Sequence, residues 1–177
     1  KDVEPGDPIL AILPIFHGFG LGVSIHSTLI LGMEVVMIPQ FKASEFDNLI
    51  KKYKPAIITG VPTLYEALTK NKGLANMDLS FMKHAVSGGD SLTELQLNNI
   101  NTFFKEHGAN IKLEQGYGMT ESLAAISLAH GNANYPGTIG IPFPKDYIKI
   151  VGVNTQQELP YGEEGELRQI KCELKLL

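Results

Sequence analysis

Residues 84–115 read HAVSGGDSLTELQLNNINTFFKEHGANIKLEQ and contain one strand–helix–strand unit. Short runs rich in apolar residues predict strands at His84–Ser87 and Ile111–Gln115. The segment between them has helical spacing and is long enough to cross back over a sheet. The unit therefore predicts two parallel strands that are joined by a helix.

Two capping-box patterns predict where helices begin. Ser91 with Glu94 opens the helix of this unit, and Thr63 with Glu66 opens an earlier helix that ends near Lys70. The apolar inner face of the later helix and its glycine stop are Leu97, Ile100, Phe104 and Gly108. Both helices follow a short apolar strand, so the strand–helix unit is repeated along the chain.

The same alternation extends to the N-terminal side. Strands are expected at Ile9–Phe16, Glu34–Ile38 and Ala56–Thr59, with helices at Gly18–Leu31 and Ser44–Lys54. The first helix is apolar nearly all round, which predicts that it is enclosed. The second has one apolar face, formed by Phe46, Leu49, Ile50 and Tyr53. The expected fold class is α/β, with a parallel sheet covered by helices on both faces.

From about Ile126 the pattern changes to short strands and turns. Further strands are expected at residues 125–129, 147–151 and 165–170. Asn132–Pro144 holds three prolines and two glycines and reads as a loop or hinge. We therefore expect an α/β part at residues 1–124 and an incomplete β-rich part at residues 125–177.

Composition narrows the classes of function. The 177 residues carry a formal charge of −4, which argues against non-specific nucleic-acid binding. No apolar run approaches the roughly 20 residues of a membrane span. The charged start Lys1–Glu4 does not resemble a signal peptide. A single cysteine, Cys172, excludes an internal disulfide and favours a reducing, cytoplasmic location.

Ligands of parallel sheets bind beyond the carboxyl ends of the strands. The first loop there, Pro14–Gly20, places His17 between a strand end and the glycines of an opening helix. The imidazole could line a pocket, and the glycines would let a ligand approach the backbone. The alternative is a histidine that packs in the core or caps the helix.

The second loop is Ser87–Ser91, with paired glycines before a helix. Backbone groups at Gly88 and Gly89 could hold a planar ring or a carboxylate. Equally, Gly-Gly-Asp is a common tight turn, with Ser91 as the helix cap. A catalytic triad of Ser87, His84 and Asp90 is not supported, because no Gly-x-Ser-x-Gly elbow is present.

The third loop, Gln115–Ser122, carries the most chemistry. Gly116 and Gly118 flank Tyr117, so its ring could lie flat against a base. Thr120 could donate a hydrogen bond to a phosphate oxygen, and Glu121 could bind a magnesium ion that keeps several waters. A hydroxyl beside a carboxylate suits a metal–triphosphate. The alternative is a turn with Thr120 as a helix cap.

Together, the three loops resemble segments of the AMP-binding (adenylate-forming) superfamily of acyl-CoA synthetases, 4-coumarate–CoA ligase-like enzymes and luciferases. Pro14–Gly20 resembles its Pro-x-x-His-x-x-Gly segment. Ser87–Leu92 resembles its Ser-Gly-Gly-x-x-Leu loop, and Gln115–Ser122 its Gly-Tyr-Gly-x-Thr-Glu signature. No Gly-x-x-x-x-Gly-Lys-Ser/Thr or Gly-x-Gly-x-x-Gly motif competes with this interpretation. The resemblance covers about Asp7–Leu167.

The resemblance implies an internal fragment of the large domain of an acid–CoA ligase. Such an enzyme converts ATP and a carboxylic acid to an acyl-adenylate, and coenzyme A then displaces AMP. By position, Thr120 would contact phosphate, Glu121 would hold Mg²⁺, and His17 would border the acyl carboxylate. Residues implied around the adenine and the acyl chain are Phe19, Gly88, Gly89, Asp90, Gln115, Gly116, Tyr117, Gly118 and Thr120.

Several features depart from the family pattern. No lysine-bearing triphosphate loop precedes Pro14, and no ribose-binding aspartate or catalytic lysine follows Leu167. Residues from about Gln169 do not continue the pattern, and Asp90 stands where small residues are usual. The isolated chain is therefore expected to be inactive. The sequence leaves its oligomeric state open.

Three alternatives to the acid–CoA ligase remain. One is an amino-acid-activating domain of a peptide synthetase, although Phe16–Gly22 lacks the aspartate usual there. The others are a luciferase-like oxygenase and a non-catalytic binding or structural fragment. Apolar residues near the loops suggest a fatty or aryl acid, but core packing explains them as well. These residues are Phe19, Leu21, Val61, Leu64 and Tyr65.

Overall fold

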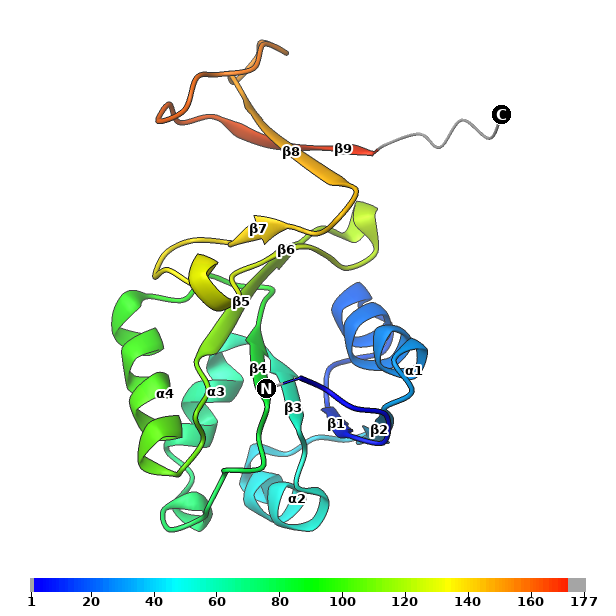
Figure 1. Ribbon diagram of the computed structural model, residues 1–177, viewed down its shortest axis with the longest axis vertical. Coiled ribbons are helices and arrows are strands. Elements are labelled where there is room, and N and C mark those ends of the chain that lie inside the picture. Colours follow the sequence, from blue (N-terminus) through cyan, green and yellow to red (C-terminus); the bar gives the residue numbers. More distant parts are fainter. Residues whose placement is uncertain (1, 172–177) are drawn as a thin grey trace. The chain divides into compact units, whose positions relative to one another are not determined.

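The structure, a computed structural model, describes residues 2–171, in which strands and helices alternate (Figure 1). The strands up to Gly140 are β1 (Pro8–Ala11), β2 (Glu34–Met37), β3 (Ile57–Gly60), β4 (His84–Ser87), β5 (Leu113–Gly118) and β6 (Ala125–Leu128). The helices are η1 (Phe19–Ser27), α1 (Thr28–Ile30), η2 (Ala43–Glu45), α2 (Phe46–Tyr53), α3 (Pro62–Thr69), η3 (Lys72–Leu74), α4 (Glu94–Glu106), η4 (Thr120–Ser122) and η5 (Gly131–Ala133). The chain divides into two compact units after Gly140, and the expected division into an α/β part at residues 1–124 and a β-rich part at residues 125–177 stays a prediction.

The sheet of the first unit confirms the expected α/β class. Its strands lie in the order β2-β1-β3-β4-β5-β6, and the pairs from β2 to β5 are parallel. The last pair, β5 with β6, is antiparallel. Helices α2, α3 and α4 pack on one face around an apolar core that includes Leu10, Phe46, Ile58, Leu68, Ala85, Phe104 and Leu113. Helix η1 lies on the other face (Figure 1), where the Ser24 hydroxyl is 2.7 Å from that of Thr59.

The first strand and helix differ from the sequence prediction. Strand β1 ends at Ala11, and Phe16 is 91% exposed, so the expected strand Ile9–Phe16 was too long. A turn closed by the His17 N–H on the Pro14 carbonyl (3.1 Å) replaces its second half.

The prediction of an enclosed helix at Gly18–Leu31 was wrong. The helix forms as η1, a π-helix, followed by α1, but its buried residues are small: Gly20, Gly22, Ser24 and Thr28. Its large apolar side chains Leu21, Leu29, Ile30 and Leu31 are exposed. The helix approaches the sheet through its small residues, which leaves the large ones pointing away from the first unit's sheet.

Both predicted capping boxes were misplaced. Helix α3 has Val61 at its N-cap and begins at Pro62, whose fixed φ suits the first helical position. Helix α4 is capped by Thr93, whose hydroxyl accepts a hydrogen bond from the Gln96 N–H at 3.3 Å. The Gln96 side chain accepts in return from the Thr93 N–H at 2.9 Å. The Ser91–Glu94 and Thr93–Gln96 patterns overlap, and the structure uses the second.

Replacing Thr93 by alanine is expected to lower the free energy of unfolding by about 1 kcal/mol, because an N-cap hydrogen bond is lost. Urea denaturation of the chain measures this change. The matched control is Ser91→Ala, which removes the hydroxyl that lies outside the cap and should stay within about 0.5 kcal/mol of the parent. Equal effects of the two substitutions would contradict the cap assignment.

The second unit starts at Ile141 and contains β7 (Ile141–Pro142), β8 (Asp146–Val151) and β9 (Glu166–Lys171). Strands β8 and β9 pair antiparallel from Asp146 with Lys171 to Val151 with Glu166, as the sequence predicts for a β-rich segment. Cys172 and the end of the predicted tail lie outside the described residues. None of the helices within residues 2–171 combines the length and the apolar character that a membrane span requires.

Candidate functional site

The first loop orients the imidazole of His17. Nδ1 of His17 accepts a hydrogen bond from the Phe19 N–H at 3.1 Å. Because Nδ1 is the acceptor, a neutral ring carries its proton on Nε2. The side chain is exposed. His17 therefore does not pack in the core, and its Nε2–H group can donate a hydrogen bond to a ligand oxygen.

All three loops meet around Gly88. A methyl group in place of its hydrogen would lie 3.3 Å from Cε1 of Phe19, in the first loop. The same methyl group would lie 3.2 Å from the carbonyl oxygen of Gly116, in the third loop. Gly88 is buried, and its N–H donates to the Gly60 carbonyl at 3.1 Å. A side chain here would press on both neighbours, so glycine allows the loops to approach one another.

The first and third loops also touch at Gly18. A Cβ atom on this residue would lie 1.7 Å from the carbonyl oxygen of Leu123, which directly follows η4. Gly22, one turn further along η1, approaches the side chain of Ala124 in the same way. The start of η1 is therefore in backbone contact with the segment that follows Thr120 and Glu121.

The third loop is a continuation of a strand. The sequence predicted that the strand ends at Gln115, but β5 runs on to Gly118, and Tyr117 pairs with Ser127 of β6. The register shifts between Tyr117 and Gly118, which indicates a β-bulge. Pairing with β6 thus holds the Gly-Tyr-Gly segment extended, where the sequence suggested a free turn.

The three side chains of the third loop that the sequence singled out are all at least partly exposed to solvent. Tyr117 is half-buried, and Thr120 and Glu121 are exposed in the single turn η4. The turn is closed by the Leu123 N–H on the Thr120 carbonyl at 3.0 Å. The ring, the hydroxyl and the carboxylate are therefore not enclosed in the apolar core of the first unit.

The second loop is a turn with a left-handed residue, Gly89, at φ +80°. Oδ1 of Asp90 accepts a hydrogen bond from the Ser91 N–H at 2.7 Å, so Asp90 stabilises the turn. Its side chain is exposed. A Cβ atom on Gly89 would lie 3.6 Å from the Val61 side chain, which brings the loop after β3 to the same edge of the sheet.

Two buried polar atoms at this edge have no hydrogen-bond partner among the described residues: Oγ of Ser87 and Nε2 of Gln115. The two residues pair in register on β4 and β5. Buried groups of this kind are rare and call for a partner. The amide fits the expected adenine contact of Gln115. Ser87 was dismissed as a catalytic serine, and only its place at the strand end could have indicated a binding role.

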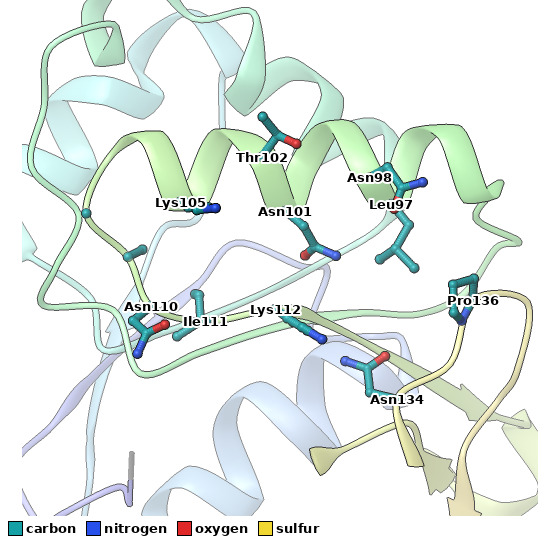
Figure 2. Close-up of a pocket in the computed structure, with 12 residues that line it drawn as sticks. Leu97, Asn98, Asn101, Thr102, Lys105, Asn110, Ile111, Lys112, Asn134 and Pro136 are labelled. Carbon is teal, nitrogen blue, oxygen red and sulfur yellow. The ribbon is translucent and has the colours of Figure 1, made fainter. Parts of the chain in front are cut away.

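The pocket that the structure forms beside α4 does not coincide with these loops. It has a volume of about 820 Å³ and lies between α4 and the approach to β5 (Figure 2). Its lining includes Asn98, Asn101, Lys105, Lys112, Asn134 and Pro136. None of the residues that the sequence singled out for binding lines it, so it does not enter the assignment of the site.

The sequence matches the family described as "AMP-binding enzyme" over residues 1–170. The chain belongs to this family. A long-chain-fatty-acid–CoA ligase of Bacillus subtilis (strain 168) is 34% identical over 172 residues, which are 94% of the chain and 29% of that ligase. A luciferin 4-monooxygenase of Nipponoluciola cruciata is 32% identical over 167 residues, or 94% of the chain and 30% of that enzyme.

Solved structures confirm the fold of this AMP-binding chain. ATP-bound MatB from Rhodopseudomonas palustris superposes with a TM-score of 0.81 at 24% identity, covering 95% of the chain and 32% of MatB. The anthranilate–CoA ligase AuaEII in complex with anthranoyl-AMP gives 0.83 at 24% identity, covering 96% of the chain and 32% of AuaEII. The chain thus spans about a third of these enzymes and about 30% of its curated relatives.

Proposed function

We propose that the protein containing these residues is an ATP-dependent carboxylic acid–CoA ligase. It would form an acyl-adenylate and pyrophosphate from acid and ATP, and then transfer the acyl group to coenzyme A. The observation that supports this most is the meeting of three loops at Gly88, with Phe19 and Gly116 within contact distance. These loops carry the segments that resemble the family's acyl and nucleotide sites.

Each loop residue receives a role under this proposal. Tyr117 lies against adenine, with Gly116 and Gly118 allowing close approach. The Nε2 amino group of Gln115, which has no hydrogen-bond partner within residues 2–171, would donate to the base. Thr120 donates to a phosphate oxygen. These groups would hold the nucleotide at the carboxyl edge of the sheet, where ligands of open α/β sheets bind.

Glu121 is the residue that would hold Mg²⁺. Its exposed carboxylate is a hard oxygen ligand that leaves room for the waters that magnesium retains. When bound, the ion neutralises phosphate charge during adenylate formation. The exposed Nε2–H of His17 would orient the acyl carboxylate, while Gly88, Gly89 and Asp90 would border the adenine and acyl sites.

Two of the five apolar residues near the loops are buried in the core and would not contact the acid. Tyr65 is buried, and its hydroxyl lies 2.8 Å from the Ile58 carbonyl and 3.0 Å from the Val86 carbonyl. Burial raises the pKa of Tyr65 well above its usual value, so the hydroxyl remains a donor. Leu64 is also in the core. Three of the five residues remain and favour a fatty or aryl acid: Phe19 beside Gly88, Val61 beside Gly89, and the exposed Leu21.

A second candidate is a luciferin-type monooxygenase, because relatives with that name match the chain as well as ligases do. Both reactions begin with an acyl-adenylate, so the loops serve either one. Formation of a thioester with coenzyme A supports the ligase, and oxygen-dependent light emission supports the monooxygenase. An amino-acid-activating domain is less favoured, because Phe16–Gly22 lacks an aspartate. The expected cytoplasmic location stays a prediction.

Calorimetry with non-hydrolysable acyl-sulfamoyl-adenosines, one with a benzoyl and one with a dodecanoyl group, tests the site. The chain is expected to bind at least one of them with micromolar affinity. Tyr117→Ala should weaken binding about 5- to 150-fold, since stacking on a base contributes about 1–3 kcal/mol. The matched control is Tyr161→Ala, which removes a fully exposed ring of the second unit. No heat from the folded parent chain, or equal loss in both variants, would contradict the proposed site.

A further inference from the structure

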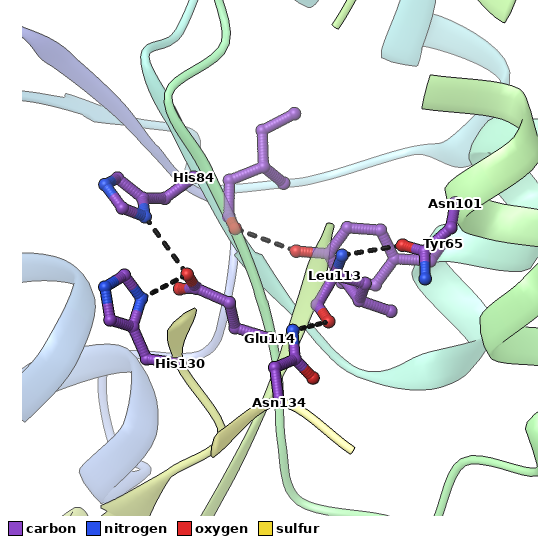
Figure 3. A network of polar contacts seen from close by, with 8 residues as sticks. Tyr65, His84, Asn101, Leu113, Glu114, His130 and Asn134 are labelled. Carbon is purple, nitrogen blue, oxygen red and sulfur yellow. Dashed lines mark hydrogen bonds and ion pairs between the residues drawn. The ribbon is translucent and has the colours of Figure 1, made fainter. Parts of the chain in front are cut away.

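A cluster of two histidines and one glutamate lies outside the three loops. Nδ1 of His130 is 2.5 Å from Oε1 of Glu114, and Nδ1 of His84 is 3.3 Å from the same oxygen. The two imidazole rings are 5.8 Å apart between centroids and tilted by 37°. Both rings point toward the carboxylate (Figure 3). Three groups that can each ligate a metal therefore converge on one point.

The three residues of the cluster lie in, or directly after, neighbouring strands of the sheet. His84 begins β4, Glu114 is the second residue of β5, and His130 follows β6 by two residues. Figure 3 shows the cluster on one side of these strands and Tyr65 with Asn101 on the other. The cluster thus occupies the face opposite the α4 core and joins three neighbouring strands.

We propose that His84, Glu114 and His130 form a binding site for a divalent transition-metal ion of the Zn²⁺ class. Two imidazoles with one carboxylate are a donor set that proteins use for Zn²⁺ and for Fe²⁺, with positions left for water. Mg²⁺ and Ca²⁺ prefer oxygen ligands, so the cluster would discriminate against them. The site would be distinct from Glu121, which the proposed function assigns to magnesium.

A small movement of the side chains would bring the three ligand atoms to the separation that they need around an ion. One ligand atom from each residue can be chosen so that all three lie within 4.8 Å of one another. Zinc–ligand bonds of about 2.0–2.2 Å place tetrahedral ligand atoms about 3.3 Å apart. The cluster would contract by about 1.5 Å at most, a shift that side-chain rotation at His130 can supply.

The three side chains of the cluster differ in how far they are exposed to solvent. Glu114 is 9% exposed, His84 21% and His130 59%. The carboxylate is thus held away from bulk water, which strengthens its attraction for a cation. The exposed His130 leaves a route by which an ion can enter, and its ring can move without disturbing the core.

The competing explanation is a hydrogen-bonded cluster without a metal. In that arrangement each Nδ1 carries a proton and donates to Glu114, which satisfies a largely buried carboxylate. Both arrangements use the same contacts, so direct metal binding distinguishes them. In the metal site, an ion replaces both protons at Nδ1.

The test is titration of the untagged full chain at pH 7.5 with Co²⁺, followed by visible absorption, and with Zn²⁺ by calorimetry. One ion per chain is expected, with a d–d band typical of coordinated Co²⁺. His130→Ala should weaken binding at least about 10-fold, because loss of even an outer-sphere partner has an effect of that size. His130→Gln, which can still hydrogen-bond Glu114, should weaken it similarly. Because His130 is exposed, neither change should unfold the chain, and circular dichroism checks this.

The matched control is His26→Ala, which removes an exposed histidine on η1 and should leave binding unchanged. Absence of a Co²⁺ band in the folded parent chain would overturn the proposal. Equal affinity of the parent and His130→Ala would do the same. The result is independent of the proposed ligase, because a chain that binds no acyl-sulfamoyl-adenosine can still bind the metal.

Discussion

Replacing Gly18 by alanine is expected to lower the free energy of unfolding by about 3 kcal/mol or more. The added Cβ atom would lie 1.7 Å from the carbonyl oxygen of Leu123 and 2.7 Å from its carbonyl carbon. These are backbone atoms, so no side-chain rotation can relieve the overlap. Forcing a methyl group into a packed position costs about 1–3 kcal/mol, and more where the backbone must move. Urea denaturation followed by circular dichroism measures the loss.

The matched control for this substitution is Gly116→Ala. A methyl group there would meet its nearest neighbours, among them the Leu128 side chain and the Ser127 carbonyl, at 3.7 Å, an ordinary contact. Because alanine is favoured over glycine within a strand by about 0.5–1 kcal/mol, Gly116→Ala should be neutral or stabilising. If both variants unfold at the same urea concentration as the parent, the start of η1 does not rest on the segment after η4.

The repeated strand–helix pattern could be predicted from the sequence because apolar periodicity is local. The strand His84–Ser87 was predicted to the residue, and the inner face of α4 is buried as expected at Leu97, Ile100 and Phe104. Signals that depend on a choice between neighbouring residues were less reliable. Ser91 and Thr93 both start a capping pattern, and local sequence does not say which hydroxyl faces the helix end.

The orientation of η1 could not be read from its sequence. An apolar segment usually buries its large side chains, yet here Gly20, Gly22 and Ser24 are buried and Leu21 is exposed. The reason is tertiary: Gly22 packs against Ala124, Gly20 against the Pro14 carbonyl and Ser24 against Thr59, so only small residues fit at these positions. The spacing of Gly18 and Gly22, which lie about one helical turn apart and both meet Leu123 and Ala124, was a signal for this close approach.

The candidate site, too, could be predicted from the sequence only in part. The residue types of the third loop are the basis of the chemistry proposed for it, because a ring, a hydroxyl and a carboxylate lie within eight residues. The sequence did not indicate that Phe19 and Gly116 would meet at Gly88, since about 100 residues separate them. Nor did it indicate the cluster at Glu114, whose members lie in β4, in β5 and just after β6.

The isolated 177-residue chain is expected to catalyse no acid-dependent ATP–pyrophosphate exchange above background. The three loops contain no lysine or arginine, and Asp90 and Glu121 add negative charge at the edge of the sheet. Thr120 and a magnesium ion on Glu121 are then the only compensation the loops offer to the triphosphate. Each preorganised charge-stabilising contact that is missing lowers the rate by about 10²–10³, so the loss of several places turnover below detection.

Binding of the acyl-sulfamoyl-adenosine and catalysis of pyrophosphate exchange place different demands on the chain, so the two measurements can give different results. Under the proposed function, affinity for an acyl-sulfamoyl-adenosine depends on stacking on Tyr117 and on the amide of Gln115, and it does not need compensation of the triphosphate charge. The chain should therefore bind the analogue and still fail to exchange pyrophosphate. An Asp90→Asn variant, which removes one carboxylate and keeps the turn, should tighten binding of ATP and leave exchange undetectable. Robust exchange by the parent chain would mean that the loops alone neutralise the triphosphate, and the charge argument would be wrong.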